Sequence, residues 1–207
     1  MMKIFISIAS YQDPMLTSTM LSAYENADLP QNLIFGICDQ SAKSIDLDNF
    51  SFENQIKYDL VDPVISEGPC WARTRVQKMF DNEDYYLQID SHMQFKKGWD
   101  SYLIKNLNLI QSINTNMHQL PIITCYPRSF EVVDFERNVF ELNSSDKNTQ
   151  VISYREDSMF IKKSFCRQIG SVAGSKISHG YLLAAGCLFT TKEFVKEVPY
   201  DPDLYFY

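Results

Sequence analysis

The segment Tyr85-Tyr86-Leu87-Gln88-Ile89-Asp90-Ser91-His92-Met93 decides the fold and most of the chemistry of this 207-residue chain. Its first five residues are a largely apolar run that predicts a buried strand. Side chains alternate across a strand, so Asp90 and His92 are expected to face one way and Ser91 another. A carboxylate and an imidazole suit Mn²⁺ or a similar divalent ion, and two ligands leave coordination positions for a diphosphate. The structural alternative is that Asp90 begins a turn and His92 is a half-buried histidine.

Outward from this segment, apolar runs alternate with amphipathic ones. Further buried strands are expected at Lys3–Ala9, Leu33–Cys38 and Gln55–Val61. Asp13-Pro14 reads as an N-cap with proline at the first helical position, and a second helix is expected after the loop Ser66–Cys70. This alternation predicts an α/β fold with a mixed, mostly parallel sheet flanked by helices.

Ligands of open α/β sheets bind beyond the carboxyl ends of the strands. We therefore expect Ala9-Ser10-Tyr11, Asp39 and Asp90-Ser91-His92 to lie on one rim of the sheet. The metal-binding pair thus falls where a site belongs.

The second half of the chain has a different pattern. A helix is expected from Gly98-Trp99-Asp100 to about Asn116, and a strand at Leu120–Tyr126. Phe130–Val172 is predicted to be an antiparallel insertion, because two short apolar runs bracket a turn-rich stretch. A further buried run covers Ala184–Phe189. Thr190 with Glu193 predicts a capping box for a last short helix.

Composition narrows the function. The net charge is −7 and 45% of the residues are hydrophobic, which favours one domain over residues 1–207 and argues against a nucleic-acid partner. The five cysteines are odd in number and contain no Cys-x-x-Cys pair, as expected for reduced thiols in a cytoplasmic protein. Neither a signal peptide nor a run of eighteen apolar residues is found, so no membrane partner is expected.

Several segments resemble, in order, the N-acetylglucosaminyltransferase family, whose best-known members modify a hydroxyproline on a cytoplasmic protein. They are Ile6–Pro14, Gly36–Gln40, Gly68–Arg73 and, most specifically, Leu87–Phe95 followed by Trp99-Asp100. Asp90-Ser91-His92 and Gly186–Phe189 are more distantly similar to the polypeptide GalNAc-transferases, which share the Asp-x-His metal motif. Both families have the Rossmann-like GT-A fold, depend on UDP-sugars and retain anomeric configuration.

The resemblance implies a function and a site. The function is metal-dependent, retaining transfer of N-acetylglucosamine, or a related N-acetylhexosamine, from UDP to a hydroxyl of a protein or glycan acceptor. Asp90 and His92 would hold Mn²⁺ against the diphosphate of the UDP-GlcNAc donor. Residues 1–100 would form the nucleotide-sugar-binding half and residues 101–207 the acceptor-side half. The implied donor-binding residues are Ala9, Ser10, Tyr11, Asp39, Arg73, Ser91, Gly186 and Cys187.

Each of these residues has an implied role. Ala9, Ser10 and Tyr11 would line the uridine pocket, with Asp39 near the base or ribose. Arg73 would reach the diphosphate or hold the metal loop, because its fork pairs with phosphate oxygens and stays charged. Gly186 and Cys187 would bring backbone close to the donor sugar.

Other candidates have simpler explanations. Asp13 is explained as a helix cap and is left off the site, Trp71 and Trp99 as packing residues, and Arg75 as a solvated helix charge. His118 is expected on the surface. His179, in Ser178-His179-Gly180, is a candidate third metal ligand.

The end of the chain raises a second hypothesis. The sequence stops at an aromatic run, Asp203–Tyr207, where the resembling proteins continue into a Gly-Glu-Glu segment. We therefore expect a truncated piece of a longer enzyme, whose catalytic residues lie beyond Tyr207. The alternative is a catalytically incomplete module of the same fold that binds a UDP-sugar or a partner. A third alternative is a plain α/β domain whose Asp-x-His is structural.

Overall fold

The computed structural model describes residues 2–113, 120–135, 139–142, 149–154, 167–172, 180 and 182–204. Two compact units can be distinguished. The first comprises Met1–Ile123 and Phe189–Tyr207, and the second comprises Thr124–Leu188. Each unit is described by itself.

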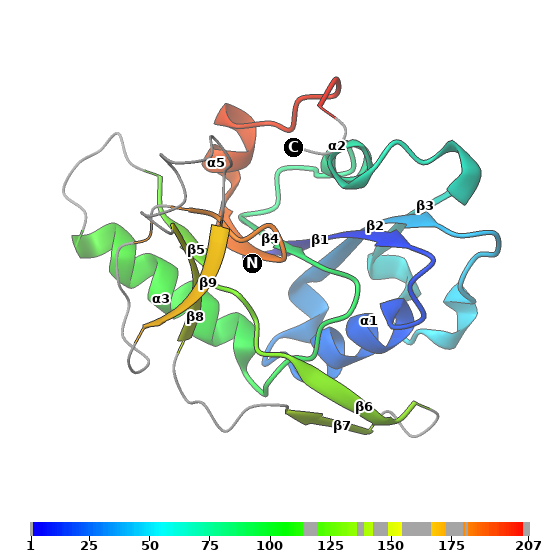
Figure 1. The fold of residues 1–207 in the computed structure, drawn as a ribbon, viewed down its shortest axis with the longest axis horizontal. Helices are drawn as coiled ribbons and strands as arrows, with labels where there is room; N and C mark the ends of the chain where they lie inside the picture. The colour runs from blue at the N-terminus through cyan, green and yellow to red at the C-terminus, as the bar shows by residue number, and fades with distance from the viewer. Residues whose placement is uncertain are drawn as a thin grey trace. The chain divides into compact units, whose positions relative to one another are not determined.

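The first unit is built on a six-stranded sheet with the order β3-β2-β1-β4-β10-β5 (Figure 1). The strands are β1 (Ile4–Tyr11), β2 (Leu33–Gln40), β3 (Ile56–Val61), β4 (Tyr85–Ile89), β5 (Ile122–Thr124) and β10 (Cys187–Thr191). β1 pairs in parallel with β2 and with β4, and β2 pairs in parallel with β3. The predicted α/β class with a mostly parallel sheet is confirmed.

Helices cover both faces of this sheet (Figure 1). They are α1 (Leu16–Glu25), α2 (Pro69–Gln77), α3 (Trp99–Ile113) and α5 (Lys192–Glu197), with short 3-10 helices η1 (Pro30–Asn32), η2 (Leu47–Asn49), η3 (Glu53–Gln55) and η4 (Pro63–Ile65). Alternation along β1 separates two cores: Ile4, Ile6 and Ile8 pack with α1 and α3, whereas Phe5 packs with α2 and α5. None of the described helices is long and apolar enough to cross a membrane.

Several element boundaries differ from the sequence prediction. Helix α1 begins at Leu16 with Met15 as its N-cap, so Asp13-Pro14 precedes the helix and does not cap it. Helix α5 is preceded by Thr191, and the predicted cap residue Thr190 is instead buried in β10, where its hydroxyl donates to the carbonyl of Pro121. Tertiary hydrogen bonding therefore outweighs the local capping pattern at Thr190.

The boundaries of three other elements also differ from those predicted. Helix α3 is described to Ile113, and the predicted extension to Asn116 lies outside the described residues. Strand β5 covers only Ile122–Thr124 of the expected Leu120–Tyr126. Strand β10 begins three residues later than the predicted run, because the backbone turns at 185–186 before it enters the sheet.

The second unit contains two antiparallel strand pairs. β6 (Phe130–Asp134) pairs with β7 (Val139–Leu142), and β8 (Thr149–Tyr154) pairs with β9 (Arg167–Val172). This confirms the predicted antiparallel insertion. The two strands that flank residues 143–148 each pair with a different partner strand.

Candidate functional site

The carboxyl ends of β1 to β4 form the rim on which the predicted site lies. Tyr11 and Gln40, the last residues of β1 and β2, are register partners, and Gln40 is also the partner of Val61 at the end of β3. β4 pairs with β1 up to Ile89, so Asp90 leaves the sheet beside the end of β1. The structure thus brings the predicted segments of three separate strands to one edge.

The loop that follows β4 is fastened to α1 on both sides of His92. The hydroxyl of Thr19 donates to the carbonyl of Ser91 at 2.7 Å and accepts the backbone N–H of Met93 at 2.9 Å. Thr19 is completely buried. A buried side chain that satisfies one carbonyl and one N–H holds the backbone around His92 in a single arrangement.

Further bonds continue this attachment toward α3. The hydroxyl of Ser22 accepts the backbone N–H of Phe95 at 2.9 Å, and the indole N–H of Trp99 donates to the carbonyl of Ala23 at 2.9 Å. The carboxylate of Asp100 accepts two backbone N–H groups just after α1. Trp99 belongs to the buried core, which confirms its predicted packing role. The loop that carries Asp90-Ser91-His92 and the segment after it are therefore hydrogen-bonded along α1.

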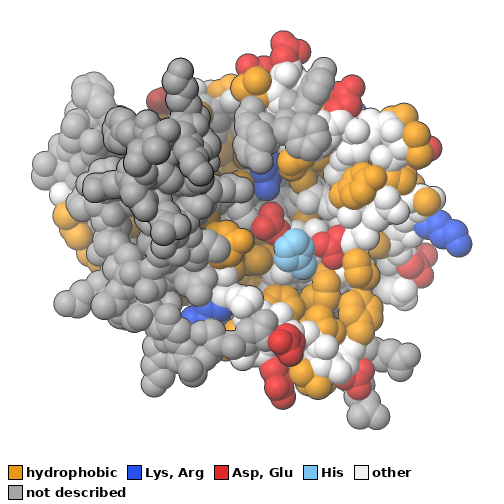
Figure 2. Space-filling model, viewed as in Figure 1, with side chains coloured by type: hydrophobic (Ala, Val, Ile, Leu, Met, Phe, Trp, Pro, Cys, Tyr) orange, Lys and Arg blue, Asp and Glu red, His pale blue; other side chains and the backbone are white. Residues whose placement is uncertain are grey.

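His92 contacts a residue that the sequence analysis had left off the site. Its Nδ1 lies 2.8 Å from Oδ2 of Asp13, and the same oxygen accepts the hydroxyl of Ser91 at 2.6 Å. The hydrogen bond to Asp13 raises the pKa of His92. The side chain of His92 is 60% exposed, so it is not the half-buried histidine of the structural alternative. Acidic side chains flank this exposed histidine on the face shown in Figure 2.

Asp90 contacts the opposite helix. Its Oδ1 lies 3.5 Å from a guanidinium nitrogen of Arg73 in α2, and its side chain is 42% exposed. Arg73 is mostly buried, with 11% of its side chain exposed. The ion pair places Arg73 beside the acidic residue of the loop, and its roles of holding that loop or reaching the diphosphate remain predictions.

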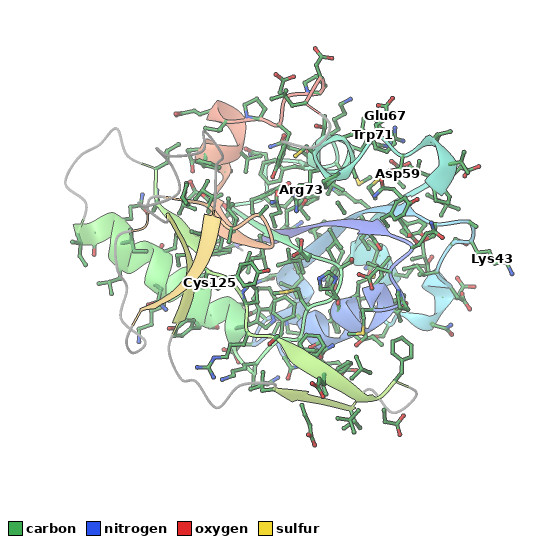
Figure 3. All side chains as sticks on the ribbon, viewed as in Figure 1. Lys43, Asp59, Glu67, Trp71, Arg73 and Cys125 are labelled. Atoms are coloured by element: carbon green, nitrogen blue, oxygen red, sulfur yellow. The ribbon has the colours of Figure 1, made fainter. Side chains whose placement is uncertain are left out.

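The neighbouring basic residue of α2 has a different partner. Arg75 donates to Asp59 of β3 at 2.7 Å, and its guanidinium lies 5.0 Å from the ring centre of Trp71. Figure 3 labels Trp71 and Arg73 on α2 and Asp59 on β3. Arg75 is thus engaged in an ion pair and is not the solvated charge that its position suggested.

Asp39 is buried at the end of β2, with 1% of its surface exposed. Its Oδ1 accepts the hydroxyl of Ser41 at 2.6 Å and its Oδ2 accepts the hydroxyl of Tyr58. Burial, followed by the hydrogen bond to Asp39, raises the pKa of Tyr58. A contact between Asp39 and a base or ribose remains a prediction.

The residues at the end of β1 differ in exposure. Ser10 is completely buried, whereas Tyr11 is 55% exposed and presents its ring at the rim. Ser10 and Asp39 are register partners and face the α1 side of the sheet, whereas Ala9 packs on the α2 side. Tyr11 is therefore the uridine-pocket candidate that solvent reaches most freely.

The remaining predicted residues lie in other parts of the chain. Gly186 precedes β10 and Cys187 is its first residue, and both fall within Thr124–Leu188, the range of the second unit. There the hydroxyl of Thr124 donates to the carbonyl of Cys187, and the sulfur of Cys187 lies 3.7 Å from that of Cys125. The four cysteines that the structure describes are thiols. His118 and His179 lie outside the described residues.

Comparison with protein families decides how this rim is interpreted. The model of the family described as Glycosyltransferase (GlcNAc) matches residues 42–207, more than half of the chain. The chain belongs to the GlcNAc glycosyltransferase family. Comparison with curated proteins finds no match.

Solved glycosyltransferase structures are similar at a distance. S. aureus TarS 1-349 in complex with UDP-GlcNAc is 19% identical over 54% of this chain and 32% of its own, with a TM-score of 0.42. The mannosyltransferase PcManGT from Pyrobaculum calidifontis, in complex with GDP-Man and Mn²⁺, is 14% identical over 66% of this chain and 38% of its own, with a TM-score of 0.45. The chain thus spans less than two fifths of either structure's length. At these values neither likeness bears on fold or function, which rest on the family match and the geometry.

The donor set of this GlcNAc glycosyltransferase fits a divalent ion. Asp90 offers an accessible carboxylate, and the contact at Nδ1 of His92 leaves Nε2 available to an ion. Metal-binding histidines almost always donate their other ring N–H to a carboxylate or carbonyl, and the carboxylate of Asp13 lies 2.8 Å from Nδ1 of His92. Within the described part of the chain, no group of three His, Cys, Asp or Glu residues could hold a metal ion. Asp90 and His92 therefore remain the two ligands predicted from the sequence.

Two residues of the site were missed from the sequence. From the sequence alone, Asp13 is explained as a helix cap and Thr19 is assigned no role. Both contact residues more than 70 positions away. The one local sign was the number of hydroxyls in the first turns of α1, Thr17-Ser18-Thr19 with Ser22. Hydroxyls are neutral or unfavourable inside helices unless they bond elsewhere.

Proposed function

We propose that this glycosyltransferase moves N-acetylglucosamine, or a related N-acetylhexosamine, from a UDP carrier to a hydroxyl of a protein or glycan acceptor. The reaction is metal-dependent and retains the configuration of the sugar. The proposal includes a donor-binding half, residues 1–100, an acceptor-side half, residues 101–207, and action in the cytoplasm. Retention, the acceptor class and the halves rest on the family resemblance.

One observation carries the proposal. In a chain of the GlcNAc glycosyltransferase family, an accessible carboxylate and an exposed imidazole follow a buried parallel strand at the rim where such sheets bind ligands. Arg73 adds a fixed positive charge 3.5 Å from that carboxylate. This combination suits a nucleoside diphosphate held through a divalent ion.

The transfer breaks the bond between C1 of the sugar and the β-phosphate oxygen, whose electron pair leaves with UDP. The acceptor oxygen bonds to C1 and releases its proton. When bound, Mn²⁺ neutralises the negative charge that grows on the departing diphosphate. Asp90 and His92 would hold that ion, and Arg73 would keep Asp90 in place and add charge toward the phosphates.

Other residues predicted for donor binding have separate roles in the proposal. Tyr11 offers an exposed ring to the base at the end of β1. The hydroxyl of Ser91 donates to Asp13, so Ser91 stabilises the loop and is not free to face the donor. Gly186 and Cys187 remain the residues predicted for the sugar.

Release of UDP from UDP-GlcNAc tests this function. The full chain is incubated with UDP-GlcNAc in Mn²⁺ or in EDTA, with and without a hydroxyproline or serine peptide. Release in Mn²⁺ but not in EDTA, abolished by Asp90→Ala, is expected. Asp81→Ala is the matched control. Asp81 is exposed and precedes the amino end of β4, whereas Asp90 follows its carboxyl end. UDP-glucose, which lacks the N-acetyl group, is expected to react more slowly.

The outcomes separate the alternatives. Mn²⁺-dependent binding of UDP-GlcNAc without release of UDP points to the non-catalytic module. Binding and release that survive EDTA and Asp90→Ala would overturn the metal-dependent function. Binding of neither metal nor nucleotide would leave the Asp-x-His motif as a structural turn.

A further inference from the structure

The two carboxylate oxygens of Asp13 make different kinds of contact. Oδ1 accepts the backbone N–H of Met15 at 2.9 Å, an ordinary bond within a turn. Oδ2 accepts the hydroxyl of Ser91 and contacts Nδ1 of His92. The turn explains only one oxygen, and the other is directed to the metal-motif loop.

The chain contains a natural comparison for this turn. Asp62-Pro63-Val64 repeats the Asp-Pro pattern of Asp13-Pro14-Met15, and Oδ1 of Asp62 accepts the N–H of Val64 at 2.9 Å. Asp62 is exposed and precedes η4. The local turn is therefore formed equally well without a histidine, so the contact between Asp13 and His92 is an addition to it.

The direction of the proton in this contact follows from charge. Oδ1 of Asp13 accepts the N–H of Met15 and Oδ2 accepts the hydroxyl of Ser91, so both oxygens act as acceptors, as in the carboxylate that aspartate forms at neutral pH. An ionised carboxylate only accepts hydrogen bonds. Nδ1 of His92 therefore carries a proton and donates it, and in the neutral ring Nε2 keeps its lone pair.

We propose that Asp13 is a positioning residue for the metal site: it holds the Nδ1–H of His92 and thereby presents Nε2 to the divalent ion. The role rests on the proposed function. A carboxylate on the far nitrogen fixes the tautomer and the ring orientation and increases the basicity of the ligand atom. Ser91 braces the same oxygen, so Asp13 fastens two consecutive residues of Asp90-Ser91-His92. Asp13 lies outside the matched residues 42–207, so this role comes from the geometry alone.

Binding of Mn²⁺ alone to the full chain tests the proposal, by titration calorimetry and by the EPR signal of free Mn²⁺. Asp13→Asn keeps the size and the turn acceptor, but its amide N–H₂ can donate to Nδ1 and so move the ring proton to Nε2. We expect affinity to fall about 10- to 100-fold. Asp62→Asn makes the same change in the matched turn and should leave affinity unchanged.

The tautomer of His92 in the wild type provides a readout that needs neither a bound metal ion nor a substitution at Asp13. In the ¹⁵N spectrum of the metal-free wild type, assigned with His92→Gln, neutral His92 should carry its proton on Nδ1. In Asp13→Asn the proton should shift toward Nε2. An Nε2–H tautomer in the wild type, or unchanged Mn²⁺ affinity in a folded Asp13→Asn while His92→Gln abolishes binding, would overturn the role of Asp13 alone. Absence of Mn²⁺ binding in the wild type would overturn the proposed function as well.

Discussion

The guanidinium of Arg73 lies 3.5 Å from the carboxylate of Asp90, whereas Arg75, two residues further along α2, pairs with Asp59. One helix thus directs two arginines to different strands. Arg73 contacts the residue proposed to bind metal, and Arg75 contacts β3, which is separated from β4 by two strands of the sheet. We therefore expect Arg73 to act at the proposed site and Arg75 to contribute to the stability of the fold.

Arg73→Gln is expected to weaken binding of UDP in the presence of Mn²⁺, because the charge beside Asp90 is lost. The ion pair is partly exposed, and such pairs are worth about 0.2–1 kcal/mol, so a loss of affinity of up to about fivefold is expected. Arg75→Gln should leave UDP binding unchanged and affect only the unfolding midpoint. Calorimetry with UDP and Mn²⁺ on both variants measures the difference, and equal losses of affinity would contradict the assignment.

Thr19→Val is expected to loosen the loop that carries His92. Valine has the same shape, but the carbonyl of Ser91 and the N–H of Met93 lose their partner in a buried place. The free energy of unfolding should fall by about 1–3 kcal/mol, and Mn²⁺ affinity should fall with it. Urea unfolding and Mn²⁺ titration measure both. Thr17→Val, on the exposed side of α1, serves as the control and should change neither.

Tyr58→Phe is expected to change how stability depends on alkaline pH. Because the pKa of Tyr58 is raised from 10.0 in the folded chain, its protonated form stabilises the fold. This contribution is complete below pH 10 and is lost as the pH rises above 10. The wild type should therefore exceed Tyr58→Phe in melting temperature at pH 8, and the gap should narrow above pH 10. A gap that widens would contradict the Asp39–Tyr58 bond; Tyr102→Phe, at an exposed tyrosine, should show no such trend.

Gly36→Ala is expected to disturb the core on which α2 rests. A Cβ at Gly36 would overlap the ring of Phe5, which packs against Tyr86 and Phe80. Overpacking of this kind costs typically about 1–3 kcal/mol. Gly180→Ala, where an added Cβ meets nothing within 4 Å, is the control. Urea midpoints of both variants measure the effect, and an unchanged midpoint for Gly36→Ala would contradict the packing.

The sequence was sufficient to predict the sheet and the metal motif because both are written in local patterns. Apolar runs such as Leu33–Cys38 have the length and composition of buried strands, and a parallel sheet then places their carboxyl ends together. Asp90 and His92 follow such a run directly. Their position at the rim needed no knowledge of distant contacts.

The supporting residues could not be predicted in the same way. Asp13 and Thr19 contact the loop only after β1, α1 and β4 have packed, and nothing local distinguishes Asp13-Pro14 from Asp62-Pro63. The predicted ends of several elements were wrong for the same reason. Thr190 has the sequence of a cap, yet its hydroxyl is used by Pro121 from another segment of the chain.

Titration of UDP into the full chain tests the central claim most directly. The measurement is made with Mn²⁺ and with EDTA, on the wild type, Asp90→Ala, His92→Gln and the control Asp81→Ala. The account predicts binding that requires Mn²⁺, is lost in Asp90→Ala and His92→Gln, and persists in Asp81→Ala. UDP binding of equal strength in EDTA, or retained in both motif variants, would contradict a metal-dependent nucleotide-sugar site at the end of β4.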